Sequence, residues 1–541
     1  MKFNLIDERW IPVLRRSGSI ERIAPWQIAE AEHSPLRVQS GRPDFDAALL
    51  EFLIGLVQTV FSPKDGEDWA GVYEGVRIKP ELLQKKMEPV RDAFWLDGDG
   101  PRFMQDLTVH QDGPDHKPVA SLLMDDGVSG DSSLFAKSGR YEAFCLPDAA
   151  AAIMTLQAFA PSGGAGHRTS LRGGGPISVT LQDEDLWRTV WCNILSQKAL
   201  RSIPGDLSRD KSEDIFPWMA PTRTSEKKGD PGISPEQIHP LQHYWAMPRR
   251  YRFHFEDGVG SCDICGEVGV PVVRSFLSRN YGANYKGPYL HPLTPYTDVK
   301  PGQPPNPKKG DGAGLSYRDW PLVCLGGEAR IPPRVVDVFQ TEERWRTAPV
   351  RQLFARGYAV DNMKPLRFLE AGLPVLHVEE AFLDQLQDDA TKLVRASEEV
   401  RRTLNQQVKA AWKKRPKEQP GDVQARVDAA FWDQTTAAFF DSVRETKGAL
   451  EKEDAEERIA AKKRYLQAIH QAALEVFDEL CPLEVELGPD NLARTARARR
   501  ALLVFTRPDT PKLLTAVGLA VEERRAKRRA GTGRKGNPKE V

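Results

Sequence analysis

A change in hydrophobic periodicity near Pro374 constrains the fold more than any other feature of the sequence. After this proline, apolar residues recur every three or four positions, which is the spacing of one helix face. Such stretches cover residues 386–408, 427–438, 459–480 and 494–505. Four long helices joined by short polar connections are typical of an antiparallel bundle. We therefore expect a helical bundle over residues 376–530.

The first 375 residues follow a different pattern. Short β-like runs, such as ISVTL, YRFHF and VPVVRSF, alternate with Pro- and Gly-rich connections and a few helical stretches. At 541 residues the chain is also too long for a single core. We expect an α+β protein in which a large irregular mixed α/β N-terminal domain, residues 1–375, is followed by a C-terminal four-helix bundle.

The last residues are strongly basic. Residues 522–541 hold eight Lys or Arg and three Glu, a net charge of +5. Such a segment can neutralise the phosphates of a nucleic acid, or it can be a solvated terminus without a partner. We expect residues 531–541 to form a basic flexible tail.

Charge and hydropathy exclude several classes of protein. Lys plus Arg and Asp plus Glu both total 76, so the whole chain has no positive field that could hold a nucleic acid unaided. The longest apolar stretch, residues 47–61, contains Glu51 and is shorter than the roughly 20 residues of a membrane span. The start, MKFNLIDERWIPV, lacks the long apolar run of a signal peptide. We expect a cytoplasmic protein without a membrane segment.

Several motifs of catalytic sites are missing from the sequence. It contains no GxxxxGKS or GxxxxGKT, no HExxH, no GxSxG and no GxGxxG between a strand and a helix. Its ten histidines are scattered without a ligand-like cluster. This pattern favours a binding protein over an enzyme, although carboxylate-based sites leave little local signature.

One CxxC motif indicates a candidate metal site. Cys262 and Cys265, in SCDICGEVG, form a tight turn that suits two thiolates on one zinc ion. A structural site needs two more ligands, and Cys145 and Asp148, in FCLPD, are the best candidates. The alternative is a reduced turn without a metal. The sequence thus predicts either a structural zinc held by these four residues or no cofactor at all.

A glycine-rich segment spans residues 160–176, APSGGAGHRTSLRGGGP. Gly163, Gly164 and Gly166 remove side chains, so that backbone amides could approach a ligand closely. Nearby positive or hydrogen-bonding groups come from His167, Arg168 and Arg172. The segment could press against a nucleic-acid backbone or minor groove. From the residues alone, a turn that needs glycine only for its backbone geometry is the favoured alternative.

Several segments together resemble one known family. In chain order they are LIDERWIPV, AALLEFLIGLVQTVFSPKD, FMQ at 103–105, SLRGGGP at 170–176, the CxxC, LHPLTP at 290–295 and GYAVDNMKP at 357–365. Their order is similar to that of the CasA family, the large subunits of the type I-E CRISPR Cascade complex. The resemblance covers most of the chain, and the family also ends in a four-helix bundle.

The resemblance implies a non-catalytic subunit of an antiviral, RNA-guided surveillance complex. Such a subunit recognises the protospacer-adjacent motif in double-stranded DNA, helps to open the duplex for guide RNA pairing (R-loop formation), and helps to recruit a helicase-nuclease. Its partners would be guide RNA, the other Cascade subunits and target DNA. Two rival hypotheses are a zinc-containing nucleic-acid enzyme and a purely structural scaffold subunit.

The resemblance also assigns residues to roles. The family's glycine loop falls on Gly163, Gly164, Ala165 and Gly166, and its basic finger on Arg279 and Asn280. A wedge that splits the first base pairs falls on Asp361, Asn362 and Met363. A loop that docks on RNA or a neighbouring subunit falls on Phe135, Ala136 and Lys137. We expect the first three groups to bind DNA.

Overall fold

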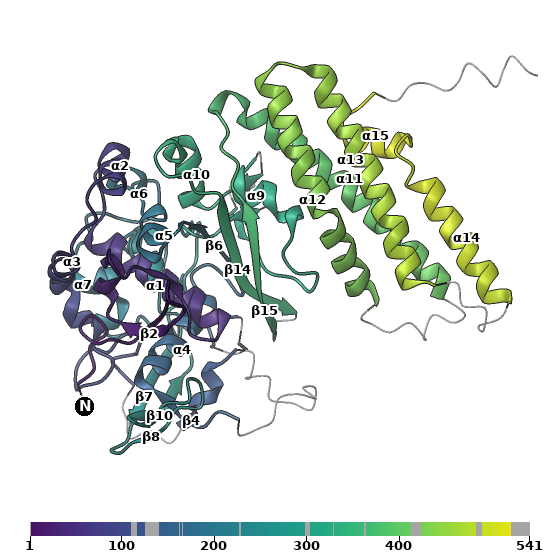
Figure 1. The fold of residues 1–541 in the computed structure, drawn as a ribbon. Coiled ribbons are helices and arrows are strands. Elements are labelled where there is room, and N and C mark those ends of the chain that lie inside the picture. The colour runs from purple at the N-terminus through teal and green to yellow at the C-terminus, as the bar shows by residue number, and fades with distance from the viewer. Residues whose placement is uncertain are drawn as a thin grey trace, which may run out of the picture. The chain divides into compact units, whose positions relative to one another are not determined.

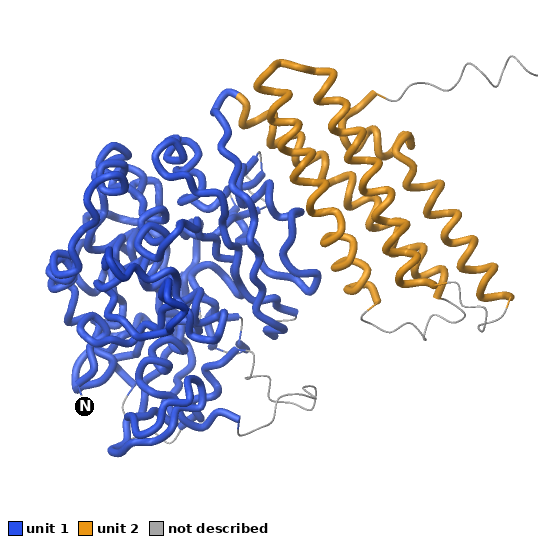
Figure 2. Tube along the Cα trace, in the orientation of Figure 1, with its two compact units in different colours: residues 1–381 blue, residues 382–541 orange. Residues whose placement is uncertain are grey.

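The computed structural model describes residues 2–109, 116–124, 140–161, 163–164, 166–226, 229–297, 303–327, 329–361, 364–412, 423–482 and 489–520. The chain forms two compact units, which are coloured separately in Figure 2. Unit 1 comprises residues Met1–Ala381 and unit 2 comprises residues Phe382–Val541. The basic residues 531–541 lie outside the described part of the chain.

The core of unit 1 surrounds helix α1 (Pro43–Val60), which contains all but the last residue of the longest apolar stretch of the sequence. Its Phe52 ring makes edge-to-face contacts, with centroids 5.2–5.8 Å apart, to four buried aromatic rings: Trp10, Phe94, Phe103 and Trp245. Such pairs add to the stabilisation from burial alone. This apolar stretch is thus a buried helix of the core.

Nine further α-helices belong to the described residues of unit 1, and most of them are labelled in Figure 1. They are α2 (Gly66–Glu74), α3 (Pro80–Met87), α4 (Leu146–Phe159), α5 (Leu186–Cys192), α6 (Gln197–Leu200), α7 (Ser212–Ile215), α8 (Gln242–Trp245), α9 (Trp320–Cys324) and α10 (Arg334–Thr341).

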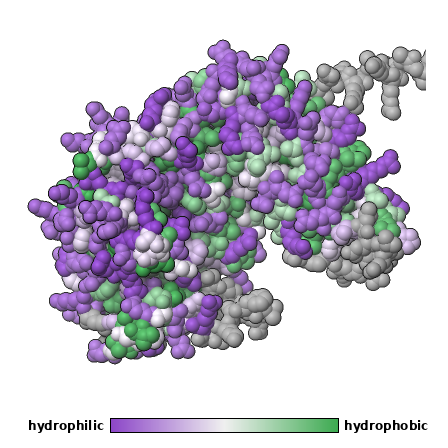
Figure 3. Space-filling model, viewed as in Figure 1, coloured by the Kyte–Doolittle hydropathy of each residue, from purple (hydrophilic) through white to green (hydrophobic). Residues whose placement is uncertain are grey.

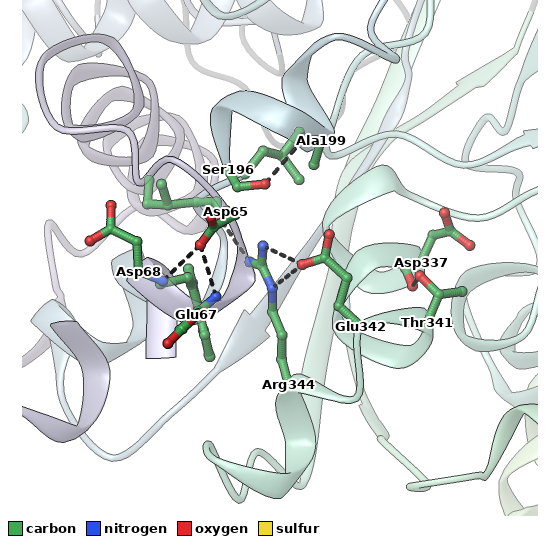
Figure 4. Close-up of polar contacts among 12 residues, drawn as sticks. Asp65, Glu67, Asp68, Ser196, Ala199, Asp337, Thr341, Glu342 and Arg344 are labelled. Carbon is green, nitrogen blue, oxygen red and sulfur yellow. Dashed lines mark hydrogen bonds and ion pairs between the residues drawn. The ribbon is translucent and has the colours of Figure 1, made fainter. Parts of the chain in front are cut away.

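Polar contacts stabilise the start of α2 and the segment that follows α10 (Figure 4). Asp65 caps α2, because its carboxylate accepts hydrogen bonds from the N–H groups of Glu67 and Asp68 at 3.1 and 3.0 Å. Beyond the end of α10, the guanidinium of Arg344 contacts the Glu342 carboxylate at 2.9 Å. It also donates to the main-chain oxygen of residue 194 at 2.8 Å. The buried Arg344 is therefore well supplied with partners.

The described strands of unit 1 pair into small antiparallel sheets. One has the order β2-β1-β3, from β1 (Ile11–Arg15), β2 (Ile20–Ile23) and β3 (Pro35–Val38). In the next, β10 (Val272–Arg279) pairs with β4 (His116–Pro118), β5 (Phe144–Cys145) and β7 (Arg250–Phe255). A third has the order β15-β14-β6, from β6 (Ile177–Gln182), β14 (Gln352–Asp361) and β15 (Lys364–Pro374). The others are β12-β11-β13, from β11 (Tyr296–Thr297), β12 (Asn306–Pro307) and β13 (Arg330–Ile331), and the pair β8 (Gly260–Ser261) and β9 (Val268–Val270).

Unit 2 contains four long helices and one short one among its described residues. They are α11 (Glu380–Trp412, whose first two residues belong to unit 1), α12 (Val423–Glu451), α13 (Ala455–Leu480), α14 (Pro489–Phe505) and α15 (Pro511–Ala516). The predicted apolar stripe on α11 is buried at all of its positions: Leu386, Ala390, Leu393, Ser397, Val400, Leu404 and Val408. The α+β prediction, with a helical C-terminal part, is confirmed.

Hydrophilic side chains cover most of the face of the molecule drawn in Figure 3, with smaller hydrophobic areas between them. No described helix combines the length and the apolar character that a membrane crossing requires.

Candidate nucleic-acid interface and metal centre

The glycine-rich segment, residues 160–176, connects α4 to β6. Gly163 and Gly164 are exposed and Gly166 is half-buried, while Ala165 lies outside the described residues. Gly164 and Gly166 have φ angles of +79° and +81°, a left-handed conformation that other residues adopt at a cost. The segment therefore presents bare main chain at two exposed positions.

Gly166 lies against the end of strand β10. The main-chain N–H of Tyr281 donates a hydrogen bond to the Gly166 carbonyl oxygen at 2.7 Å. A Cβ atom on Gly166 would stand 2.8 Å from the Asn280 Cβ and 2.9 Å from the Tyr281 nitrogen, which is too close for van der Waals contact. The structure thus brings together two of the expected DNA-binding segments, the glycine loop and the finger.

The other end of the glycine-rich segment lies on the β14–β15 hairpin. A Cβ atom on Gly175, whose φ is +66°, would collide with the Val360 side chain. Asp361 is exposed at the end of β14, whereas Asn362 and Met363 lie outside the described residues. One continuous segment therefore contacts both the finger and the hairpin that was expected to carry the wedge.

Arg279 and Asn280, the expected finger residues, stand at the end of β10. Arg279 is half-buried and faces Arg250 in the register with β7, while Asn280 is exposed. The Arg250 guanidinium donates to the Asn280 carbonyl oxygen at 3.3 Å and forms ion pairs with Asp106 at 2.7 Å and Glu226 at 3.0 Å. Charged neighbours thus fix the main chain of the finger.

Arg172 does not face a ligand, so the expectation that it offers a binding group is wrong. Its guanidinium is buried and donates to the Glu51 carboxylate at 2.9 Å and to the Ala158 carbonyl oxygen at 3.1 Å. The carboxylate of Glu51 interrupts the apolar stretch of α1 because the core needs a partner for this cation. Arg172 therefore ties the glycine-rich segment to α1.

His167 and Arg168 remain nearer the surface, and both are half-buried. Arg168 donates to the Ser225 hydroxyl at 2.8 Å and to the Ser225 carbonyl oxygen at 3.3 Å. Burial lowers the pKa of His167, and the positive charges of Arg249 and Lys117 lower it further. A neutral imidazole is therefore favoured at His167 near pH 7.

Tyr281 is a candidate interface residue that the sequence analysis missed. Its φ is +60°, which is rare for a bulky residue, and it is 41% exposed. Two main-chain hydrogen bonds hold it there: its N–H donates to Gly166, and its carbonyl oxygen accepts from the Ser225 N–H at 3.0 Å. No sequence signal predicts this conformation, because it depends on segments far apart in the chain.

The four expected metal ligands meet where β5, α4 and the β8–β9 turn come together. Cys145 ends β5, and Asp148 lies in the first turn of α4. Cys262 and Cys265 lie between β8 and β9, and Asp263 of this turn accepts hydrogen bonds from the N–H groups of residues 142 and 143 at 2.7 and 2.8 Å. These bonds join the two halves of the cluster.

The ligand atoms of this cluster, one from each residue, all lie within 4.8 Å of one another. The sulfurs of Cys145 and Cys265 are 3.7 Å apart. Asp148 Oδ2 accepts from Cys145 Sγ at 3.2 Å and from Cys262 Sγ at 3.0 Å. Metal–sulfur bonds of ~2.3 Å in tetrahedral geometry would place two sulfurs ~3.8 Å apart. The chemistry and the spacing of this donor set therefore fit a tetrahedral metal ion.

The thiols of the cluster influence one another. The hydrogen bond between Cys145 and Cys262 lowers the pKa of Cys262 to about 7 and raises the pKa of Cys145, which burial raises further. Burial raises the pKa of Cys265 to about 11. Cys262 is thus the thiol most readily deprotonated, as a metal ligand must be.

Three residues are expected to form a docking loop. Phe135, Ala136 and Lys137 lie outside the described residues.

Comparison with known proteins agrees with the expected resemblance. The sequence matches the family model of the CRISPR-associated protein Cse1 over residues 4–476. The chain therefore belongs to the Cse1 family of CRISPR-associated proteins. A curated relative, the CRISPR-associated protein CasA/Cse1 of Thermus thermophilus, is 28% identical over 171 residues. These residues are 30% of this chain and 32% of the relative, so the match spans about a third of the relative's length.

Solved structures share the fold over nearly the whole chain. A crystal structure of Thermus thermophilus CasA has a TM-score of 0.67 at 17% identity and covers 94% of this chain and 99% of its own. Thermobifida fusca Cse1 has a TM-score of 0.68 at 16% identity, covering 95% and 98%. A chain of a CRISPR RNA-guided surveillance complex has a TM-score of 0.67 at 16% identity, covering 93% and 99%.

Proposed function

We propose that this chain is a non-catalytic subunit of a type I-E RNA-guided surveillance complex, Cascade, in antiviral defence in the cytoplasm. Its family membership supports this role, as does its likeness to a chain of a CRISPR RNA-guided surveillance complex. Its partners are guide RNA, the other Cascade subunits and double-stranded target DNA. Phe135, Ala136 and Lys137 are proposed to dock on RNA or a neighbouring subunit.

The glycine-rich segment and the finger are proposed to recognise the protospacer-adjacent motif from the minor groove. One observation carries this proposal: Gly166 and the Asn280–Tyr281 main chain are in direct contact, beside the exposed Gly163 and Gly164. Bare main chain can enter a groove about 6 Å wide, where side chains at these positions would collide. Ala165 and Arg279 are proposed to bind DNA as well, and the exposed Tyr281 ring offers a contact for base edges or sugars.

The β14–β15 hairpin is proposed to open the duplex next to the motif. Asp361, Asn362 and Met363 would enter the stack, and unstacking costs a few kcal/mol per step. Guide pairing offsets this cost, because exchange of duplex for heteroduplex is nearly balanced. The contact between Gly175 and Val360 supports a link from motif recognition to opening. Recruitment of a helicase-nuclease would follow R-loop formation.

Cys145, Asp148, Cys262 and Cys265 are proposed to hold a structural zinc ion. When bound, the ion would cross-link β5, α4 and the β8–β9 turn without taking part in chemistry. Asp148→Cys should retain zinc in the purified chain at least as well as the natural sequence, since thiolate is the softer ligand. Asp148→Ala should release it more readily. The zinc content of the purified natural chain is measured by elemental analysis. A natural chain without zinc would contradict the site.

The experiment that tests the main role uses the reconstituted complex. Binding of short duplexes with and without a protospacer-adjacent motif is measured with this chain present and then omitted. Tight, motif-dependent binding that requires the chain is the expected result. Unchanged binding after omission would favour a structural scaffold, and metal-dependent cleavage by the isolated chain would favour an enzyme.

A further inference from the structure

One arginine from the N-terminal sheet reaches the metal cluster. Arg22 lies on β2, and its Nη2 donates to Cys265 Sγ at 3.2 Å and to Cys145 Sγ at 3.7 Å. Its Nη1 forms an ion pair with Glu267, two residues beyond the CxxC. The side chain of Arg22 is 26% exposed. A single guanidinium therefore contacts two sulfurs of the cluster and a carboxylate beside it.

The negative charge of the donor set explains why a cation beside it would be stabilising. Three thiolates and one carboxylate carry four negative charges, while a zinc ion carries two positive ones. The loaded site would therefore keep a net negative charge that is partly buried, which is costly without a compensating group. Hydrogen bonds from outside the ligand set usually fix the ligands and tune their basicity.

We infer that Arg22 is a positioning residue of the metal centre, which donates N–H···S hydrogen bonds to Cys145 and Cys265 and compensates the excess negative charge of the loaded site. This inference rests on the proposed zinc. The planar fork of a guanidinium can meet two sulfurs and a carboxylate together, whereas the ammonium of lysine is a compact point charge. Arg22 thereby joins the β2-β1-β3 sheet to the turn that precedes β9 and β10.

The test measures how fast zinc leaves the full-length chain for a chromogenic chelator. Arg22→Ala should release zinc about 10-fold faster or more, the usual scale for loss of such a partner. Arg22→Lys should also release zinc faster, because lysine keeps the positive charge but cannot make the paired hydrogen bonds. Arg37→Ala is the matched control, since Arg37 is exposed on β3 of the same sheet and contacts Gln39.

A spectroscopic readout separates this role from a general loss of stability. In cobalt-substituted protein, loss of N–H···S bonds leaves more electron density on sulfur, so the sulfur-to-metal charge-transfer band should move to longer wavelength in Arg22→Ala and not in Arg37→Ala. Arg22→Gln provides the same comparison if Arg22→Ala does not fold.

Zinc release and a cobalt band that both match the natural chain in Arg22→Ala, or in Arg22→Gln in its place, would overturn the inference. Natural release rates in Arg22→Lys would overturn the positioning role, because charge compensation alone would then be the cause. A natural chain without zinc would remove the metal site and this inference together, whereas a failure of motif recognition would leave both intact.

Discussion

The main-chain N–H of Tyr281 and the main-chain oxygen of Gly166 are joined by a hydrogen bond of 2.7 Å. The bond crosses 115 positions of sequence and holds the end of β10 against the glycine-rich segment. It involves no side chain, so substitutions change it only through backbone conformation and steric fit.

Two glycine substitutions separate backbone strain from packing. Gly164 and Gly166 have nearly the same φ, but an added Cβ meets open space at Gly164 and Asn280 at Gly166. Alanine at either position should cost roughly 1–2 kcal/mol for the left-handed conformation. Gly166→Ala should cost roughly 1–3 kcal/mol more because of the collision. Thermal unfolding of the purified chain measures the difference, and equal midpoints would contradict the close approach.

Tyr281→Gly should separate stability from DNA binding. Glycine adopts a φ of +60° freely, so the unfolding midpoint should be unchanged or higher. In the reconstituted complex, affinity for motif-bearing DNA should fall by roughly 1–2 kcal/mol, because the glycine variant loses apolar ring surface that would be buried against the groove. Tyr281→Phe keeps the ring and should bind as the natural chain does. Equal affinity of the glycine variant would mean that the ring does not meet DNA.

Arg172→Ala should destabilise unit 1 strongly, although Arg172 belongs to a segment rich in glycine. Its side chain and that of Glu51 are 3% and 4% exposed, and removal of one partner leaves a buried charge. A loss of roughly 3–5 kcal/mol is expected in denaturant unfolding. The double variant Arg172→Met with Glu51→Leu should lose less, because no charge remains unpaired. A single variant as stable as the natural chain would contradict the burial of this pair.

His243 should make unit 1 less stable in mild acid. Burial lowers its pKa from an ordinary 6.5 to about 4, so the folded chain keeps the imidazole neutral where the unfolded chain protonates it. This stabilisation is complete above pH 6.5 and is lost progressively as the pH falls from 6.5 to about 4. The full effect is roughly 3 kcal/mol. Unfolding midpoints of the natural chain and His243→Gln between pH 7 and 4.5 should converge, and parallel curves would contradict the shift.

The helical part of the fold could be predicted from the sequence because helix periodicity is a local signal. Leu386 and Val408 lie at the two ends of one stripe, and every predicted position between them is buried in α11. The strands of unit 1 are harder to assign. β10 pairs with segments more than 100 positions away, and nothing local in the sequence specifies such partners.

The residues of the candidate sites also divide into those that a local sequence signal predicts and those that depend on distant segments. The CxxC spacing identifies Cys262 and Cys265 by itself, because a tight turn brings two thiols together. The fate of Arg172 and the backbone of Tyr281 depend on α1 and on the segment around Ser225. Residue type alone made Arg172 look like a ligand-facing cation, whereas its place in the core is decided by Glu51.

Strand β10 sets the separation between the two candidate sites. It faces Cys145 at Val272 and ends at Arg279 beside the glycine-rich segment, and its eight residues span roughly 23 Å at ~3.3 Å per step. The pairing of β10 with β7 shifts register between Val273 and Ser275. Beyond this irregularity successive side chains alternate between faces, so a deletion of one residue between Ser275 and Arg279 would shorten the strand by one step and also turn Arg279 to the opposite face. The family's variation in this strand is therefore expected to come as substitutions, with length changes confined to the turns at its ends.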